Sequence, residues 1–218
     1  MYIVIAGLSD IGKNLAGLLV QEGNEVVLIE RDSAKCTEIA EGSDIMVITG
    51  DASQKSTLEE ARVKSAHAFV AAAGDDSENL MLCMIAKELG TKTVISIVDD
   101  AEHTETFKQA GISLQVNADV VAAKHIHRLI SQPYVKDFIS FEGAEIFEIE
   151  IEEDMKCVGQ TVSRLGTPDG VKVLVVQREG KYLSADREIQ PKDWLTLIVN
   201  RDSTKKGTEF MNRWFAKG

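Results

Sequence analysis

The chain has 218 residues, 44% of them hydrophobic and 27% charged, which is ordinary for a folded protein with one large or two small cores. Its formal net charge of −11 argues against nucleic-acid binding, which depends on clustered Lys and Arg. No apolar stretch approaches the roughly 20 residues needed to cross a bilayer, and no basic, apolar signal precedes the first strand-like run. We therefore expect a folded cytosolic protein.

Short apolar runs alternate with stretches of helical period over the first 130 residues or so. This alternation predicts an α/β fold, a Rossmann-like doubly wound parallel sheet with helices on both faces. A helix expected over 118–130 carries more apolar surface than one short helix needs, which makes it a candidate for packing against another subunit. The predicted strands span 2–6, 26–29, 45–48, 68–72, 94–98 and 114–116.

The pattern breaks at Gln132 and Pro133, because proline cannot continue a helix. We expect a linker there, and the net charge of −9 over 1–132 against −2 over 133–218 also suggests two units. The second unit is predicted to be a small α+β domain over 133–202, followed by a docking helix over 203–218 that carries Phe210, Met211, Trp214 and Phe215. Its expected elements are strands at 147–152, 171–176, 181–183 and 194–199, a short helix at 161–165 and a turn at Glu179 and Gly180.

The stretch GLSDIG, residues 7–12, follows the first predicted strand and opens a helix. Gly7 permits a tight turn, Gly12 lets helix and strand pack closely, and the helix start offers free N–H groups to an anion. Glu30 lies 18 residues after Gly12, at the end of the next strand, where a carboxylate accepts hydrogen bonds from ribose hydroxyls and repels a 2′-phosphate. The alternative is that the glycines serve only the turn and that Glu30 is simply solvated.

The cysteines and histidines give little indication of a catalytic or metal site. The three cysteines are too far apart for metal ligation or a redox pair, so Cys36, Cys83 and Cys157 are interpreted as buried or neutral thiols. His125 and His127, at i and i+2, point to different faces of one helix and make a poor metal pair. Without a Tyr-x-x-x-Lys pair or a credible catalytic domain after 133, we expect neither an enzyme nor a metal site.

Several longer motifs are more discriminating than the glycines, and by them the chain resembles regulator-of-potassium-conductance (RCK, or KTN) proteins of the TrkA/KtrA type, with TrkA-N and TrkA-C domains. The resemblance covers essentially the whole length. The motifs are YIVIAGLSDIGKNLA from residue 2, VVLIERD at 26–32, VITGDAS at 47–53, VAAAGDDSENLM at 70–81, FKQAGISLQVNADVVAA at 107–123, and the C-terminal stretch from VGQTVSRLG to WLTLIV.

The resemblance implies a site for an adenine nucleotide, NAD(H), AMP, ADP or ATP, in the first domain. Asp51 and Asp75 have an alternative interpretation as turn and cap residues. The implied residues are Gly7, Ser9, Asp10, Ile11 and Gly12 for the phosphate turn, Glu30 for the ribose, Arg31 at the rim near the adenosine, Asp51 and Ala52 at the adenine edge, and Ala73, Gly74, Asp75, Glu78 and Asn79 at the far end.

The chain departs from the family pattern at positions that would hold phosphate. Ser9 and Asp10 stand where relatives show glycine and arginine, and Ile97 stands where they often place an arginine, which leaves Lys13 as the one expected cation nearby. We expect adenosine recognition to survive better than recognition of di- or triphosphates, which makes AMP a serious candidate. In the second domain, SADR at 184–187 replaces the common Pro-Arg-Gly-Asp, which puts an effector site such as one for cyclic di-AMP in doubt.

The function that the resemblance implies is that of a nucleotide-sensing regulatory subunit that gates a potassium transporter or channel through ligand-dependent conformational change. Such a subunit would be cytoplasmic, at the inner face of the cell membrane, and would form homodimers that assemble into a tetramer or an octameric ring. Two alternatives stay open: an NAD-dependent oxidoreductase, and a structural assembly protein with a degenerate nucleotide site.

Overall fold

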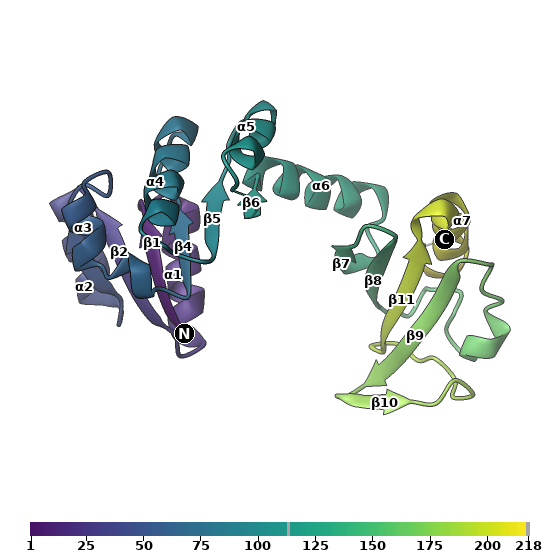
Figure 1. Ribbon diagram of the computed structural model, residues 1–218. Coiled ribbons are helices and arrows are strands. Elements are labelled where there is room, and N and C mark those ends of the chain that lie inside the picture. The colour runs from purple at the N-terminus through teal and green to yellow at the C-terminus, as the bar shows by residue number, and fades with distance from the viewer. Residues whose placement is uncertain (113, 217–218) are drawn as a thin grey trace. The chain divides into compact units, whose positions relative to one another are not determined.

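The computed structural model describes residues 1–112 and 114–216 and divides the chain into two compact units, Met1–Ala122 and Ala123–Gly218. Each unit has its own sheet (Figure 1) and its own hydrophobic core. The dividing point lies inside helix α6 (Ala118–Ser131), which ends just before the break expected at Gln132 and Pro133.

The N-terminal unit contains a six-stranded parallel sheet in the order β3-β2-β1-β4-β5-β6. This topology confirms the predicted Rossmann-like sheet. The strand order reverses between β1 and β4, and at such a switch point the carboxyl ends of the strands open a crevice between helices of opposite faces. The strands are β1 (Tyr2–Ala6), β2 (Glu25–Glu30), β3 (Met46–Thr49), β4 (Ala68–Ala71), β5 (Val94–Ile97) and β6 (Leu114–Val116).

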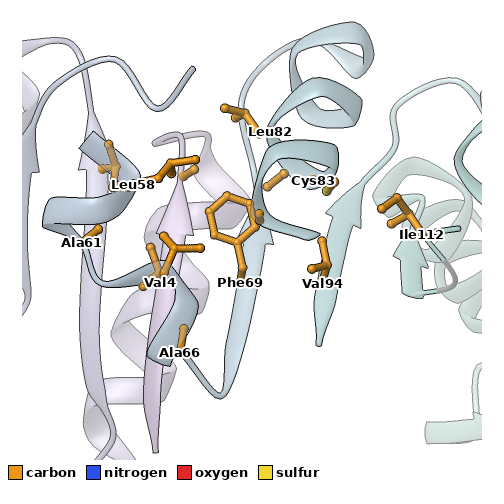
Figure 2. Packing of buried hydrophobic residues seen from close by; sticks show 14 of the residues in the cluster. Val4, Leu58, Ala61, Ala66, Phe69, Leu82, Cys83, Val94 and Ile112 are labelled. Carbon is orange, nitrogen blue, oxygen red and sulfur yellow. The ribbon is translucent and has the colours of Figure 1, made fainter. Parts of the chain in front are cut away.

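Each face of this sheet has its own apolar cluster, because successive side chains of a strand point to opposite sides. From β1, Ile3 and Ile5 join the cluster that contains Ala16 of α1, whereas Val4 joins the cluster that contains Phe69 of β4. The Phe69 ring lies fully buried between Val4 and Val94 of the neighbouring strands (Figure 2). The helices are α1 (Asp10–Gln21), α2 (Ser33–Gly42), α3 (Lys55–Glu60), α4 (Asp76–Glu88) and α5 (Thr104–Gln109).

The C-terminal unit contains a five-stranded antiparallel sheet in the order β10-β9-β11-β8-β7 and a final helix, α7 (Thr204–Phe215). Gly207 lets α7 approach β11 closely, because a Cβ at this position would lie 2.5 Å from a Val199 methyl group. The buried Phe210, Met211 and Phe215 of α7 complete the core, as the sequence predicts. The strands are β7 (Val135–Ser140), β8 (Ala144–Glu150), β9 (Val171–Arg178), β10 (Lys181–Leu183) and β11 (Trp194–Asn200).

Some details of this unit differ from the sequence-based expectation. Strand β7 was not expected, β8 begins earlier than the predicted strand at 147–152, and the predicted helix at 161–165 is a 3₁₀ turn over Val162–Arg164. Gln132 and Tyr134, where a linker was expected, are buried and form hydrogen bonds with Thr208 and Asn212 of α7. The last residues of the predicted helix over 203–218, Lys217 and Gly218, lie outside the described residues.

The cysteines are free and buried, and burial raises the pKa of Cys83 to about 11 and that of Cys157 to about 12, so both are neutral thiols as predicted. Within 1–112 and 114–216 no group of His, Cys, Asp and Glu is arranged to hold a metal ion. No helix in that same part of the chain has the length and apolar character needed to cross a bilayer.

Candidate functional site

A cleft of about 270 Å³ opens at the carboxyl ends of β1, β2 and β4 in the N-terminal unit. It lies at the switch point of the sheet, where ligands bind in folds of this class. The predicted residues that line it are Gly7, Ser9, Glu30, Arg31, Ala52, Ala73, Gly74 and Glu78. The lining residues that the sequence reasoning did not single out are Leu8, Ile29, Lys35, Gly50 and Leu82.

The floor of the cleft is the turn between β1 and α1, and its glycines are required by space. Gly7 has φ of +97°, and a Cβ there would lie 2.6 Å from the carbonyl carbon of Ala72. A Cβ at Gly12 would lie 2.7 Å from the carbonyl oxygen of Gly7. The turn therefore lies close both to the loop after β4 and to the first turn of α1.

Ser9 caps the helix that begins at this turn. Its hydroxyl accepts a hydrogen bond from the N–H of Gly12 at 3.3 Å, and its own N–H donates to the Ala72 carbonyl at 3.3 Å. Since the hydroxyl acts as an acceptor here, its proton remains able to donate to a ligand oxygen. Ser9 thus takes up one of the free helix N–H groups and offers a single O–H donor in exchange.

Glu30, the last residue of β2, forms a fixed acceptor on the cleft wall. One carboxylate oxygen accepts from the N–H of Leu8 at 3.0 Å, and the other accepts from the N–H of Asp32 at 3.0 Å. Each carboxylate oxygen can accept more than one hydrogen bond, so both retain capacity for a hydroxyl pair. The bond to Leu8 also ties the end of β2 to the turn after β1.

Two basic side chains line the cleft, and both come from the segment after β2. Arg31 forms an ion pair with Glu78 of α4, and Lys35 lies in the first turn of α2. The expectation that Lys13 is the one nearby cation is wrong. Lys13 forms an ion pair with Glu38 of α2 at 2.9 Å and does not line the cleft, because its position on α1 directs it toward the neighbouring helix.

The remaining predicted residues do not line the cleft, and several of them form local hydrogen bonds near it. Asp51 accepts from the N–H of Ser53 at 2.8 Å, and the hydrogen bonding from Ser53 lowers the pKa of this carboxyl. Asp75 caps α4 by accepting from the N–H of Glu78 at 3.0 Å, and the buried Asn79 binds both backbone groups of Ala73. The predicted residues outside the cleft lining are Asp10, Ile11, Gly12, Asp51, Asp75 and Asn79.

A buried carboxylate next to this cap was not anticipated. Asp76 accepts from the N–H groups of Asp99 and Asp100 at 2.7 and 3.0 Å and contacts the His103 ring at 2.7 Å. Burial raises the pKa of Asp76, but these hydrogen bonds outweigh it, so the pKa lies below its ordinary value. The hydrogen bond with Asp76 raises the pKa of His103. Asp76 thereby joins the start of α4 to the segment after β5.

Ile97, which stands where relatives often place an arginine, is 5% exposed and belongs to the apolar cluster of Ile3, Ile5 and Ala72. Its side chain brings no charge to the cleft. The only basic side chains among the cleft-lining residues that the structure describes are therefore those of Arg31 and Lys35.

Comparison with known proteins gives a consistent family match. The model of the TrkA-N domain family matches residues 3–118. The chain is 32% identical over 212 residues to a protein of Methanothermobacter thermautotrophicus named Trk system potassium uptake protein TrkA homolog, covering 95% of this chain and 98% of that protein. It is also 32% identical over 216 residues to a protein of the same name from Pyrococcus horikoshii, covering 93% of each.

The fold is also that of a solved structure described as the GsuK channel bound to NAD. The TM-score is 0.65 at 19% sequence identity. The match covers 92% of this chain and 37% of the GsuK chain, so this chain corresponds to a minor part of that protein. At this level of sequence identity, the similarity shows a shared fold only.

Proposed function

The chain belongs to the TrkA-N domain family, and on that premise we propose that it is a nucleotide-sensing regulatory subunit of a potassium uptake system. The names of its relatives support the potassium system. The observation that carries the sensing role is the cleft at the β1–β4 switch point, where Glu30 is held by two backbone N–H groups beside a turn that requires glycine.

The proposed ligand is an adenine nucleotide, one of NAD(H), AMP, ADP and ATP. Glu30 would accept hydrogen bonds from the ribose hydroxyls, while Ser9 and the start of α1 would meet the first phosphate. A glycine at position 9 would let the backbone approach a chain of phosphates, whereas Ser9 offers a single O–H donor. Nucleotides with few phosphates, AMP first, therefore fit this cleft best. The NAD bound to GsuK supports the wider class.

The proposed role is regulatory rather than enzymatic. Glu30, which lines the cleft, accepts hydrogen bonds from the N–H groups of Leu8 and Asp32, and a carboxylate held in this way is suited to binding a ligand. A ligand gates a partner only if it binds two conformations with different affinities, so nucleotide occupancy would shift the balance between shapes of the assembled subunit.

The proposed partner is a membrane-embedded potassium transporter or channel, with this chain in the cytoplasm at the inner face of the cell membrane. We also propose a homodimer that assembles into a tetramer or an octameric ring. Helix α6 supports self-association, because it has no buried residue in the single chain. Its Val121, Ile126 and Ile130 are 58%, 56% and 76% exposed. Nucleic acid is not a proposed partner.

The Glu30→Ala variant tests the ligand assignment. Loss of the ribose hydrogen bonds should weaken binding of adenine nucleotides by about 1–3 kcal/mol in titration calorimetry of the full chain. Glu41→Ala, which removes an exposed acid from α2, is the matched control and should change nothing. A folded Glu30→Ala protein with wild-type affinity would refute the assignment.

A further inference from the structure

The Arg31–Glu78 ion pair crosses the mouth of the candidate cleft. Arg31 follows β2 and Glu78 lies in the first turn of α4, which follows β4, while β1 lies between these two strands. Neighbouring strands are about 4.8 Å apart, so the pair joins segments whose strands are about 10 Å apart. It passes over the carboxyl end of β1, where the turn at Gly7 and Ser9 forms the cleft floor.

The pair is open to exchange with a ligand. The Arg31 side chain is 63% exposed and that of Glu78 is 27% exposed, and ion pairs in such solvated positions contribute little to stability. A phosphate is as good a partner as a carboxylate for a guanidinium group, because both accept two parallel hydrogen bonds from it. An anionic ligand in the cleft can therefore replace Glu78 at small cost.

Glu78 also has a second position available within its own helix. It stands three residues after Asp75, which caps α4 and accepts the N–H of Glu78. This is the spacing of a capping box, in which the acidic side chain reaches back to the N–H of the cap residue. A carboxylate released from Arg31 would thus move from the mouth of the cleft to the start of α4.

We propose that Glu78 is the resident counter-ion of Arg31 and that an anionic group of the bound nucleotide replaces it. This inference rests on the proposed nucleotide-sensing function and adds a reason why the site would select charged ligands. The site admits nucleotides in preference to nucleosides, since a phosphate compensates Arg31 for the loss of Glu78 and an uncharged nucleoside does not. The exchange also links occupancy of the cleft to the N-terminal turn of α4.

Calorimetry of the full chain with AMP tests this exchange through a double-mutant cycle. Glu78→Gln removes the competing charge and should tighten AMP binding about two- to five-fold, the range that corresponds to an exposed ion pair. Arg31→Gln should weaken AMP binding and reduce the ratio of AMP affinity to adenosine affinity. In the Arg31→Gln background, Glu78→Gln should have almost no effect. Glu38→Gln, which breaks the comparable Lys13 pair outside the cleft, is the control and should leave AMP affinity unchanged.

Two results would overturn the exchange while leaving the proposed function intact. One is AMP binding by the wild type that Glu78→Gln leaves unchanged in a protein whose thermal unfolding is normal. The other is an equal gain from Glu78→Gln with and without Arg31, which would show simple repulsion of the ligand by Glu78. A wild-type chain that binds no adenine nucleotide would instead overturn the proposed function, and this inference with it.

Discussion

The shape of the cleft floor depends on single residues at which the surrounding backbone leaves no space for a side chain. At Gly7 the positive φ and the nearby Ala72 backbone leave no room for a side chain, whereas at Gly74 a Cβ would meet nothing within 4 Å. Both glycines line the same cleft, but only Gly7 is required by its geometry. The two positions therefore form a matched pair for mutation.

Gly7→Ala should lower the free energy of unfolding by about 2–5 kcal/mol, because an unfavourable backbone conformation adds to an overpacked contact. Gly74→Ala should stay within about 0.5 kcal/mol of wild type. Denaturant unfolding of the two variants measures the difference. Equal stabilities would show that the turn relaxes without strain and that Gly7 is not required.

The sequence could predict the positions of Glu30 and the two turn glycines, because these positions follow from a strand, a turn and a helix that are adjacent in the chain. It could not place Lys35 in the cleft or Lys13 outside it, since that depends on which way each helix faces. The Arg31–Glu78 pair joins residues from different βα units, and local pattern does not show such a pairing.

Among the secondary-structure elements, α4 is joined to the segment after β5 by Asp76, which contacts His103 of the 3₁₀ turn at Ala101–His103. Other acidic residues interact electrostatically near this contact. Burial raises the pKa of Asp99, and the charges of Asp76, Asp119 and Asp75 raise it further. The contact between Asp76 and His103 is strongest when the carboxylate is charged and the imidazole is protonated.

This contact predicts a pH dependence of stability. His103 has a raised pKa in the folded state, so its contribution is complete below the unfolded value of about 6.5 and is lost as pH rises through the folded pKa. Asp76 has a lowered pKa, so its contribution is complete above about 3.9 and is lost as pH falls through the folded pKa. Both groups therefore contribute fully to stability between about pH 3.9 and about pH 6.5.

Denaturant unfolding at pH 5.5 and pH 8.5 checks this dependence. The wild type should lose more stability on going to the higher pH than His103→Gln, because the variant has no imidazole to deprotonate. His127→Gln, at an exposed position of α6, is the control and should behave like the wild type. An identical pH response of wild type and His103→Gln would contradict the contact.

The elements of the parallel sheet could be predicted because buried strands appear as continuous apolar runs. Strand β7 could not, because its pairing with β8 shifts register between Val135 and Asp137, which disrupts the alternation of inward and outward residues. The turn at Glu179 and Gly180, by contrast, was predicted, and both residues have the positive φ that a tight hairpin needs.

At the scale of the whole molecule, the chain consists of two units, each with its own sheet. The N-terminal unit holds the candidate nucleotide cleft, and the C-terminal unit has a separate core under its own sheet. The sequence indicated two units through the break in pattern at Gln132 and Pro133 and through the difference in net charge between 1–132 and 133–218. The apolar residues of α6 are exposed in the single chain, and the sequence could indicate this surplus of apolar surface but not the partner that would cover it.

Hydrogen–deuterium exchange of the full chain with and without saturating AMP tests the nucleotide assignment most directly, because it reports where a nucleotide sits. We expect slower exchange over residues 7–13, 30–35 and 73–78, the segments that surround the cleft, and a smaller effect in Glu30→Ala at the same AMP concentration. Saturable AMP binding with protection confined to other segments would contradict the assignment of the cleft.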